Sequence, residues 1–231
     1  MTNRRRTQLV VGLMDSPKNS DKVIRVGTEN LEAPVIRNAT DIIRGGGAVV
    51  YPTDTLYALG TNALDEEATL RIFKIKNRPL DRPLPIAVSG MKMTKKLAFV
   101  DDEARQLIGA FWPGALTLIL PVKSIVPSVV VGGGSTVGLR MPNHPIPLAI
   151  MRMCGLPIVV TSANKHGHSS PLDVTEALRQ LGSEVDLFLD CGTGGGQPST
   201  IIDLTQTPPQ MLRRGPITRK MVEEIIGHVE N

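Results

Sequence analysis

Apolar residues recur at two spacings along this chain, one typical of helices and the other of buried strands. Val35, Ile36 and Ala39 begin a helical pattern that continues to Ile43 and ends at three consecutive glycines. The same spacing predicts helices over 35–43, 66–76, 104–111, 147–153, 174–181 and 221–229. Short apolar runs bounded by Pro and Gly predict strands over 48–51, 84–88, 116–122, 126–131, 136–141, 158–161, 185–189, 200–204 and 211–213.

The alternation of these elements predicts an α/β fold with a mixed sheet. Strands over 116–141 follow one another through Pro and Gly turns, so part of the sheet is expected to be antiparallel. The segments 200–204 and 211–213 are expected to form a hairpin. No interdomain linker is evident, and we expect one folded domain over residues 26–231. Residues 1–25 hold six basic and two acidic side chains with little apolar periodicity, which predicts a flexible basic extension.

The composition is that of an ordinary soluble domain and excludes several classes of protein. Of 231 residues, 41% are hydrophobic and 21% charged, so the chain is neither disordered nor fibrous. No apolar run approaches the ~20 residues that span a bilayer. Cys154 and Cys191 lie far apart without metal-ligand spacing. We therefore expect a cytoplasmic protein with no membrane segment, no disulfide framework and no protein-held metal site.

The charge and the aromatic content bear on nucleic-acid binding. A net charge of +4 permits a nucleic-acid partner without demanding one. Seven aromatic residues (4 Phe, 2 Tyr and 1 Trp) are too few for a surface that stacks many bases.

Two polar clusters directly follow predicted elements, in the positions where α/β folds bind ligands. The segment 51–60 brings hydroxyls, a carboxylate and a phenol together, although a turn that caps the next helix explains this pattern at least as well. The segment 74–83 holds four cations, and Pro79 and Pro83 stiffen it. Such a cluster suits phosphate binding, and a solvated helix end is an equal alternative.

Two further clusters complete the candidate chemistry. The segment 159–170 carries small hydroxyl and amide side chains that suit a phosphate or nucleobase, and its histidines are interpreted as surface residues. A scattered set spans 132–140, 198–200 and 213–215; there Arg140 is placed either to clamp a carboxylate or to form a surface ion pair. The glycine run lacks the Lys-Ser/Thr pair of a P-loop, and no dinucleotide-binding glycine motif introduces a helix. An enzyme of this kind would act by positioning and charge neutralisation.

Taken in order, six short motifs resemble the YrdC-like family of L-threonylcarbamoyl-adenylate synthases, in the short form without an extra C-terminal domain. They are Tyr-Pro-Thr-Asp-Thr at 51–55, Lys-Asn-Arg-Pro at 76–79, Arg-Met-Pro at 140–142, Ser-Ala-Asn at 162–164, Ser-Thr-Ile-Ile-Asp at 199–203 and Arg-Arg-Gly at 213–215. The resemblance covers about residues 26–231. It implies a single-domain α/β fold, with a twisted mixed parallel/antiparallel sheet flanked by helices around a large concave cavity.

The resemblance also implies a function. Members of the family are nucleotidyltransferases that make threonylcarbamoyl-AMP and pyrophosphate from L-threonine, bicarbonate or CO2, and ATP. A separate transferase complex passes the threonylcarbamoyl group to tRNA, as N6-threonylcarbamoyladenosine. Mg²⁺ is expected to accompany ATP.

The motifs imply a set of site residues. Lys76 and Arg78 are expected to contact the ATP phosphates and to act in catalysis. The expected threonine-binding residues are Thr55, Arg140 and the backbone of Val160. The remaining expected ATP-binding residues are Thr136, Ser162, Asn164, Ser170 and Arg214.

The sequence departs from the family pattern at two positions, and two other interpretations of its function are possible. Arg82 and Ala87 occupy positions where many members have Asn and His, so neither is assigned to the site. A double-stranded RNA-binding module without catalysis is the main alternative, since phosphate contacts need no sequence reading. A carbamoyl-transfer domain like that of hydrogenase maturation proteins ranks low, because the zinc-finger cysteines of those chains are missing here.

Overall fold

The computed structural model describes residues 22–194 and 196–230, whose strands form two mixed sheets. The strands are β1 (Val23–Arg25), β2 (Val49–Tyr51), β3 (Ala58–Gly60), β4 (Ile86–Ala87), β5 (Leu116–Pro121), β6 (Thr136–Arg140), β7 (Ile158–Val159), β8 (Thr161–Ser162), β9 (Leu187–Asp190), β10 (Thr200–Asp203) and β11 (Gln210–Arg213). One sheet has the order β1-β9-β2-β3-β8 and the other β11-β10-β5-β6-β4-β7. The mixed α/β fold is confirmed, and its strands are divided over two sheets.

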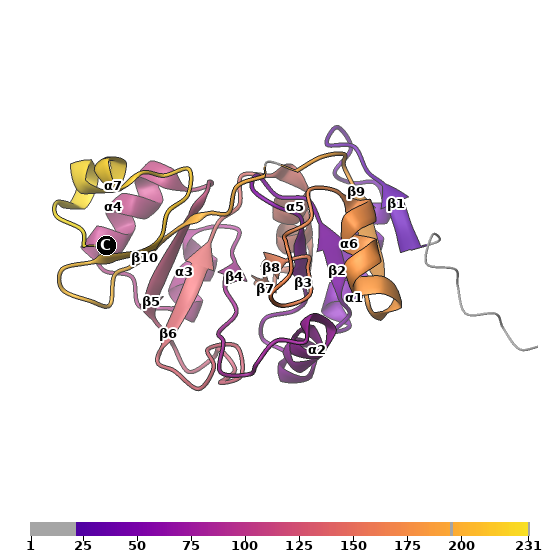
Figure 1. Cartoon of the computed structure of the whole chain (residues 1–231), viewed down its shortest axis with the longest axis horizontal. Helices are drawn as coiled ribbons and strands as arrows, with labels where there is room; N and C mark the ends of the chain where they lie inside the picture. Colours follow the sequence, from indigo (N-terminus) through magenta and orange to yellow (C-terminus); the bar gives the residue numbers. More distant parts are fainter. Residues whose placement is uncertain (1–21, 195, 231) are drawn as a thin grey trace, which may run out of the picture.

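Seven helices cover the two sheets in the described part of the chain. They are α1 (Pro34–Arg44), α2 (Glu66–Lys76), α3 (Met91–Leu97), α4 (Asp102–Phe111), α5 (Pro145–Cys154), α6 (Val174–Leu181) and α7 (Arg219–Ile226). Helices α1 and α5 pack together beside the five-stranded sheet, whereas α4 and α7 pack together at the opposite end of the molecule (Figure 1). Capping residues set several helix ends: Asp65, Asp101 and Asp173 each accept a backbone N–H from the first turn of the following helix.

One short segment joins the two sheets. Strand β7 belongs to the six-stranded sheet and β8 to the five-stranded sheet, and only Val160 separates them. The N–H of Val159 donates to the carbonyl of Thr61 (2.9 Å), and the N–H of Val160 donates to that of Pro85 (2.8 Å). A Cβ at Gly60 would lie 2.4 Å from the Val159 carbonyl oxygen, so this close approach requires glycine.

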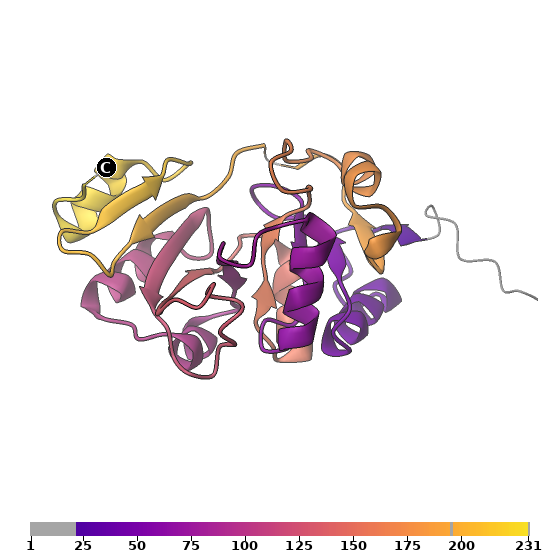
Figure 2. The same ribbon diagram turned by 60° about the horizontal axis from the view of Figure 1, so that its bottom comes forward.

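The chain crosses between the sheets again after β9. The connection from β9 to β10 runs from the five-stranded to the six-stranded sheet along one side of the molecule (Figures 1 and 2). One apolar cluster contains residues from both sheets, so the two sheets share a hydrophobic core. Side chains of α1 and α5 form a second apolar cluster on the other face of the five-stranded sheet.

Three expectations from the sequence need correction. The segment 126–131 is a series of turns rather than a strand, with Val130 N–H bonded to Pro127 O and Val131 N–H to Ser128 O. Helix α3 and strand β3 were not predicted. Strand β1 lies inside the expected 1–25 extension and pairs with β9, so the folded domain begins before residue 26. Residues 1–21, which hold the rest of that predicted extension, lie outside the described residues.

No helix within residues 22–194 and 196–230 is long and apolar enough to cross a membrane.

Candidate active site between the two sheets

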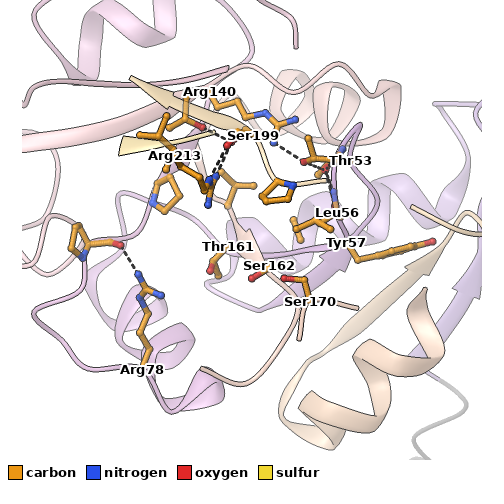
Figure 3. Close-up of a pocket in the computed structure, with 18 residues that line it drawn as sticks. Thr53, Leu56, Tyr57, Arg78, Arg140, Thr161, Ser162, Ser170, Ser199 and Arg213 are labelled. Carbon is orange, nitrogen blue, oxygen red and sulfur yellow. Dashed lines mark hydrogen bonds between the residues drawn. The ribbon is translucent and has the colours of Figure 1, made fainter. Parts of the chain in front are cut away.

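A cavity of about 370 Å³ lies where the two sheets meet, and all six motif segments contribute to its lining (Figure 3). This volume is within the usual range for small-molecule sites. Six of the predicted site residues line it: Thr55, Arg78, Arg140, Val160, Ser162 and Ser170. Polar residues that were not assigned from the sequence also line it: Thr53, Thr117, Thr161, Ser199 and Arg213.

Positive charge dominates the described lining. Arg78, Arg140 and Arg213 all contribute to it, and no described Asp or Glu does. Burial lowers the pKa of each of these arginines from its usual value, although a guanidinium keeps its proton at neutral pH. Three partly desolvated cations around one hollow make it a site for an anion with several charges.

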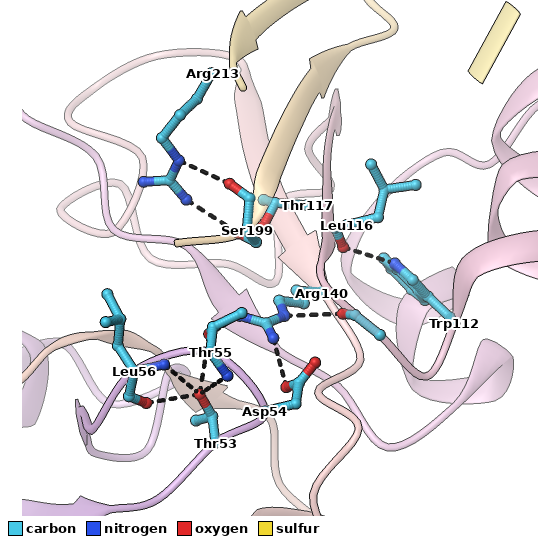
Figure 4. A network of polar contacts seen from close by, with 11 residues as sticks. Thr53, Asp54, Thr55, Leu56, Trp112, Leu116, Thr117, Arg140, Ser199 and Arg213 are labelled. Atoms are coloured by element: carbon cyan, nitrogen blue, oxygen red, sulfur yellow. Dashed lines mark hydrogen bonds and ion pairs between the residues drawn. The ribbon is translucent and has the colours of Figure 1, made fainter. Parts of the chain in front are cut away.

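Arg140, at the end of β6, is held on three sides (Figure 4). It is 5% exposed. Its Nε donates to the carbonyl of Gly114 (3.0 Å), and its Nη1 donates to Oγ1 of Thr55 (2.7 Å). Its Nη2 forms an ion pair with Asp54. These contacts use three of the five guanidinium N–H groups, which leaves two for a carboxylate in the cavity.

The Thr53–Thr55 segment is a hydroxyl-stabilised turn after β2. Thr53 Oγ1 accepts from the N–H groups of Thr55 (3.1 Å) and Leu56 (3.2 Å) and donates to the carbonyl of Leu56 (2.6 Å). Thr53 Oγ1 and Thr55 Oγ1 are 3.0 Å apart, and both residues are buried. A turn is therefore present, but strand β3 follows it rather than the helix that the sequence interpretation expected it to cap. The turn places Thr55 against Arg140.

The end of α2 places Arg78 at the cavity. Asn77 adopts the left-handed conformation (φ 51°) that ends the helix, and the Arg78 N–H returns to the carbonyl of Phe73 (2.9 Å). The guanidinium of Arg78 then donates to the carbonyls of Arg82 (3.1 Å) and Pro83 (3.0 Å). The proline-containing loop after α2 holds this cation in place, as its sequence predicted.

Lys76 and Asn164 lie beneath the cavity and do not line it. Lys76 is 1% exposed, and its Nζ donates to the carbonyls of Ser162 and Asn164 and to Oδ1 of Asn164. Burial lowers the pKa of Lys76 to about 7, with smaller effects from Arg78 and Lys165. The expected direct contact of Lys76 with a phosphate is not compatible with this arrangement, because the described contacts use all three donors of the ammonium. Asn164 is likewise 7% exposed and bonded within its own loop.

Thr136 and Arg214 are two further residues that the sequence places in the site and the structure places outside the lining. Thr136 pairs with Pro121 at the opposite end of β6 from Arg140. Arg214 and its neighbour Arg213 are both exposed, and only Arg213 lines the cavity. Successive residues of a strand point to opposite faces, so the Arg-Arg motif alone does not show which arginine faces inward.

Arg213 is anchored to a buried pair of hydroxyls. Its Nε donates to the carbonyl of Ser199 (2.8 Å) and its Nη2 to Oγ of the same residue (3.0 Å). Ser199 Oγ lies 2.9 Å from Oγ1 of Thr117, and both of these residues are 4% exposed. Figure 4 shows this group on the six-stranded sheet, facing the Arg140 group. Ser199 and Arg213 were not assigned from the sequence, although both lie within motif segments, at 199–203 and 213–215.

The chemistry of the described residues does not favour a protein-held metal. No group of three or more His, Cys, Asp or Glu side chains with metal-binding geometry occurs among residues 22–194 and 196–230. Cys154 and Cys191 are both free thiols.

Comparisons with known proteins agree with the motifs. A family model named Sua5/YciO/YrdC, described as telomere recombination, matches residues 41–215. A threonylcarbamoyl-AMP synthase from Pyrococcus abyssi is 41% identical over 87% of this chain and 60% of its own length. A putative threonylcarbamoyl-AMP synthase from Mycobacterium tuberculosis is 39% identical over 83% of this chain and 89% of its own.

A solved structure extends the likeness to three dimensions. The structure of P. abyssi Sua5 complexed with L-threonine superposes with a TM-score of 0.85 at 39% identity, covering 90% of this chain and 61% of the other. The chain therefore spans about 60% of the length of the P. abyssi relative.

Proposed function

This chain belongs to the Sua5/YciO/YrdC family, and from that premise we propose that it is a threonylcarbamoyl-AMP synthase. The reaction joins L-threonine, bicarbonate or CO2, and ATP, and it releases pyrophosphate. The observation that carries the proposal is the cavity between the sheets, where three arginines and a row of hydroxyls converge from the motif segments. The L-threonine complex of the P. abyssi relative supports an amino acid as one of the ligands.

The cavity divides naturally into two subsites. We assign the threonine carboxylate to the remaining N–H groups of Arg140, with the Thr55 hydroxyl and the Val160 backbone beside it. We assign the triphosphate to Arg78, in the loop after α2, and to Arg213, at the end of β11. Ser162 and Ser170 line the remaining wall and suit the nucleoside.

The arrangement suits the two chemical steps of this reaction. The amine of threonine first attacks the carbon of CO2, and a positively charged pocket favours the unprotonated amine that this step requires. A carbamate oxygen then attacks the α-phosphorus, and pyrophosphate leaves with the bonding electrons. Arg78 and Arg213 are placed to neutralise its developing charge. Holding the reactants in one cavity removes much of the entropic barrier and protects the short-lived carbamate from water.

The cavity offers Mg²⁺ only weak ligands. Mg²⁺ prefers carboxylate and phosphate oxygens, and none of the described lining residues is an Asp or a Glu. We therefore propose that any Mg²⁺ enters as the ATP complex, held by the phosphates, and we assign no step to it.

The downstream partners follow from the product. Threonylcarbamoyl-AMP is a mixed anhydride, so a transferase complex that acts on tRNA must consume it before water does. A partner that acts on tRNA supports a cytoplasmic location. The two free cysteines agree with it.

Pyrophosphate release tests the proposal directly. Purified protein is expected to release pyrophosphate only when ATP, L-threonine and bicarbonate are all present, and mass spectrometry is expected to detect the adenylate. Arg78→Ala is expected to abolish this release with the circular dichroism spectrum unchanged, because it removes one of the cations around the phosphates. Threonine-independent release, or a near-normal rate in Arg78→Ala, would contradict the assignment.

The alternative of a pure double-stranded RNA-binding module has less support. Three of the cations that would have to contact RNA phosphates, Lys76, Arg78 and Arg140, are buried or half-buried around a cavity, and Arg213 and Arg214 are exposed. Salt-sensitive RNA binding without threonine-dependent pyrophosphate release would favour that alternative.

A further inference from the structure

The ammonium of Lys76 lies where three oxygen atoms of a single loop converge. Its Nζ donates to the carbonyl of Ser162, to that of Asn164 (2.6 Å) and to Oδ1 of Asn164 (3.2 Å). In its protonated form, the side chain has three N–H donors and no acceptor, so these contacts use it completely. With an exposed fraction of 1%, the side chain also has no path into the cavity that would keep these bonds.

Lys76 determines which way the side-chain amide of Asn164 faces. Because an ammonium only donates, the atom that faces it must be Oδ1 rather than the NH2 group. The NH2 group then points to the other side, where it donates to the carbonyl of His168 (2.5 Å). The amide of Asn164 is thereby locked in one orientation.

The locked amide determines the hydrogen-bonding direction of Ser162. The hydroxyl of Ser162 lies 2.5 Å from Oδ1 of Asn164, which can only accept, so its single hydrogen points inward. Ser162 lines the cavity, and what it presents there is the lone pairs of Oγ. At this point of the wall the cavity accepts a hydrogen bond and does not donate one.

The same lysine connects this loop to the helix that carries Arg78. The N–H of His166 donates to the Lys76 carbonyl (2.7 Å), and Lys165 Nζ donates to that of Ile75 (2.5 Å). Helix α2 ends at Lys76, and Arg78 follows two residues later. Two walls of the cavity are therefore tied together, by Lys76 and by Lys165.

Building on the proposed function, we propose that Lys76 is a positioning residue rather than a phosphate ligand. It fixes the loop 162–168 so that Ser162 accepts a hydrogen bond from an N–H or O–H group of the nucleotide, and it holds that loop in register with Arg78.

A double-mutant cycle separates positioning from direct contact. Lys76→Met and Ser162→Ala are each expected to raise the KM for ATP roughly tenfold, the effect of one lost hydrogen bond, with the KM for threonine changed less than twofold. The double variant is expected to match the single variants, because both act through one hydroxyl. A hundredfold rise in the double variant would mean independent contacts and would overturn the proposal. Simple loss of folded protein would lower kcat and leave the KM for ATP unchanged.

Asn164→Ala provides a second variant in case Lys76→Met does not fold. It removes the Oδ1 atom that links Lys76 to Ser162 and leaves the lysine in place. If Lys76 acts by positioning Ser162, the KM for ATP of Asn164→Ala is expected to rise as much as that of Ser162→Ala. An unchanged KM for ATP in Asn164→Ala would overturn the proposal.

Hydrogen–deuterium exchange tests the inference even if the proposed reaction fails. In Lys76→Met, the amides of Asn164 and His166 are expected to exchange at least tenfold faster than in the wild type, whereas the amides of β5 are expected to be unchanged. Lys165→Met is the matched control, because Lys165 anchors the same loop to the same helix end without contacting Ser162 or Asn164. Unchanged loop exchange in Lys76→Met would overturn the positioning role, whatever the assay shows.

Discussion

At the scale of single residues, Arg140 connects the two sheets through its side chain alone. It extends from β6 of the six-stranded sheet and binds Asp54 and Thr55, which follow β2 of the five-stranded sheet. The ion pair is buried, with side-chain exposed fractions of 6% and 17%. Breaking such a pair is strongly unfavourable when one charge is left without a partner, so a charge-preserving substitution is the sharper probe.

Arg140→Lys is expected to raise the KM for threonine at least tenfold and to change the KM for ATP less than twofold. A lysine retains the charge but has no planar fork to serve Thr55, Asp54 and a carboxylate together. Steady-state pyrophosphate release at varied threonine or ATP concentration checks this. Arg179→Lys is the matched control, because Arg179 forms an exposed pair with Glu176 on α6. A change confined to the KM for ATP would show that Arg140 has been given the wrong role.

The buried Lys76 makes the stability of the fold depend on pH. Its pKa is about 7 in the folded protein and about 10.5 when exposed, so between these values the unfolded chain binds a proton that the folded protein does not. The free energy of unfolding of the wild type, relative to that of Lys76→Met, is therefore expected to rise between about pH 7 and 10.5, by at most about 1.4 kcal/mol per pH unit. Urea unfolding followed by the fluorescence of Trp112 measures this difference. A difference that stays constant or falls across that range would contradict the assignment.

The motifs indicated residues that meet at one cavity, but they did not indicate how deeply each side chain is buried. Thr55, Arg78 and Arg140 line the cavity as their motifs indicated. The motif around Lys76 gave no sign that this cation would be buried beneath the wall, because burial depends on the distant loop that covers it. Arg213 and Arg214 are adjacent, and the choice between them depends on which face of β11 meets the cavity, which only strand pairing decides.

At the scale of secondary-structure elements, β11 reaches the cavity only because its end lies close against β10. A Cβ at Gly215 would lie 2.4 Å from the backbone N of Thr200 and 2.6 Å from the carbonyl oxygen of Pro198. No side chain fits at this approach without moving backbone. Arg213, two residues earlier, depends on the same approach for its bonds to Ser199.

Gly215→Ala is expected to lower the free energy of unfolding by about 1–3 kcal/mol, because the added methyl group overpacks the backbone, and to raise the KM for ATP. Gly109→Ala is the control: Gly109 lies in α4, and nothing lies within 4 Å of the place that an added methyl group would take. There alanine is expected to stabilise the protein by about 0.5–1 kcal/mol. Chemical denaturation of both variants measures these changes in the free energy of unfolding. A Gly215→Ala protein as stable as the wild type would show that the end of β11 moves without cost.

Elements with strong periodicity were predicted well, and those set by tertiary contacts were not. The apolar pattern of α2 identified its bounds, and capping by Asp65 explains why. The segment 126–131 has the composition of a strand, yet Gly132 (φ 60°) and Gly133 (φ 77°) follow in conformations typical of turns. Val126, Val130 and Val131 are buried without a strand partner. Strand β8 has only two residues, so pairing with β3 rather than local sequence defines it.

At the scale of the whole molecule, the cavity lies between the two sheets. A ligand bound there would contact both of them. Arg78 and Arg213 approach the proposed triphosphate from opposite sides of the cavity, and each is already fixed by backbone carbonyls. A ligand that binds only the folded arrangement stabilises it by mass action. Binding of ATP should therefore be visible as thermal stabilisation of the entire domain.

ATP at about 100 times its dissociation constant is expected to stabilise the fold by about 2.7 kcal/mol, a rise in Tm of roughly 5–10 °C for a domain of this size. In Arg213→Gln at the same ATP concentration, tenfold weaker binding is expected to remove about 1.4 kcal/mol of that gain, whereas the shift caused by threonine alone is expected to persist. Arg105→Gln is the control, since Arg105 pairs with Asp102 on the exposed surface of α4. If Arg213→Gln kept the full ATP shift while Arg78→Ala lost it, the loop after α2 would hold the triphosphate without β11, and the role given to Arg213 would be wrong.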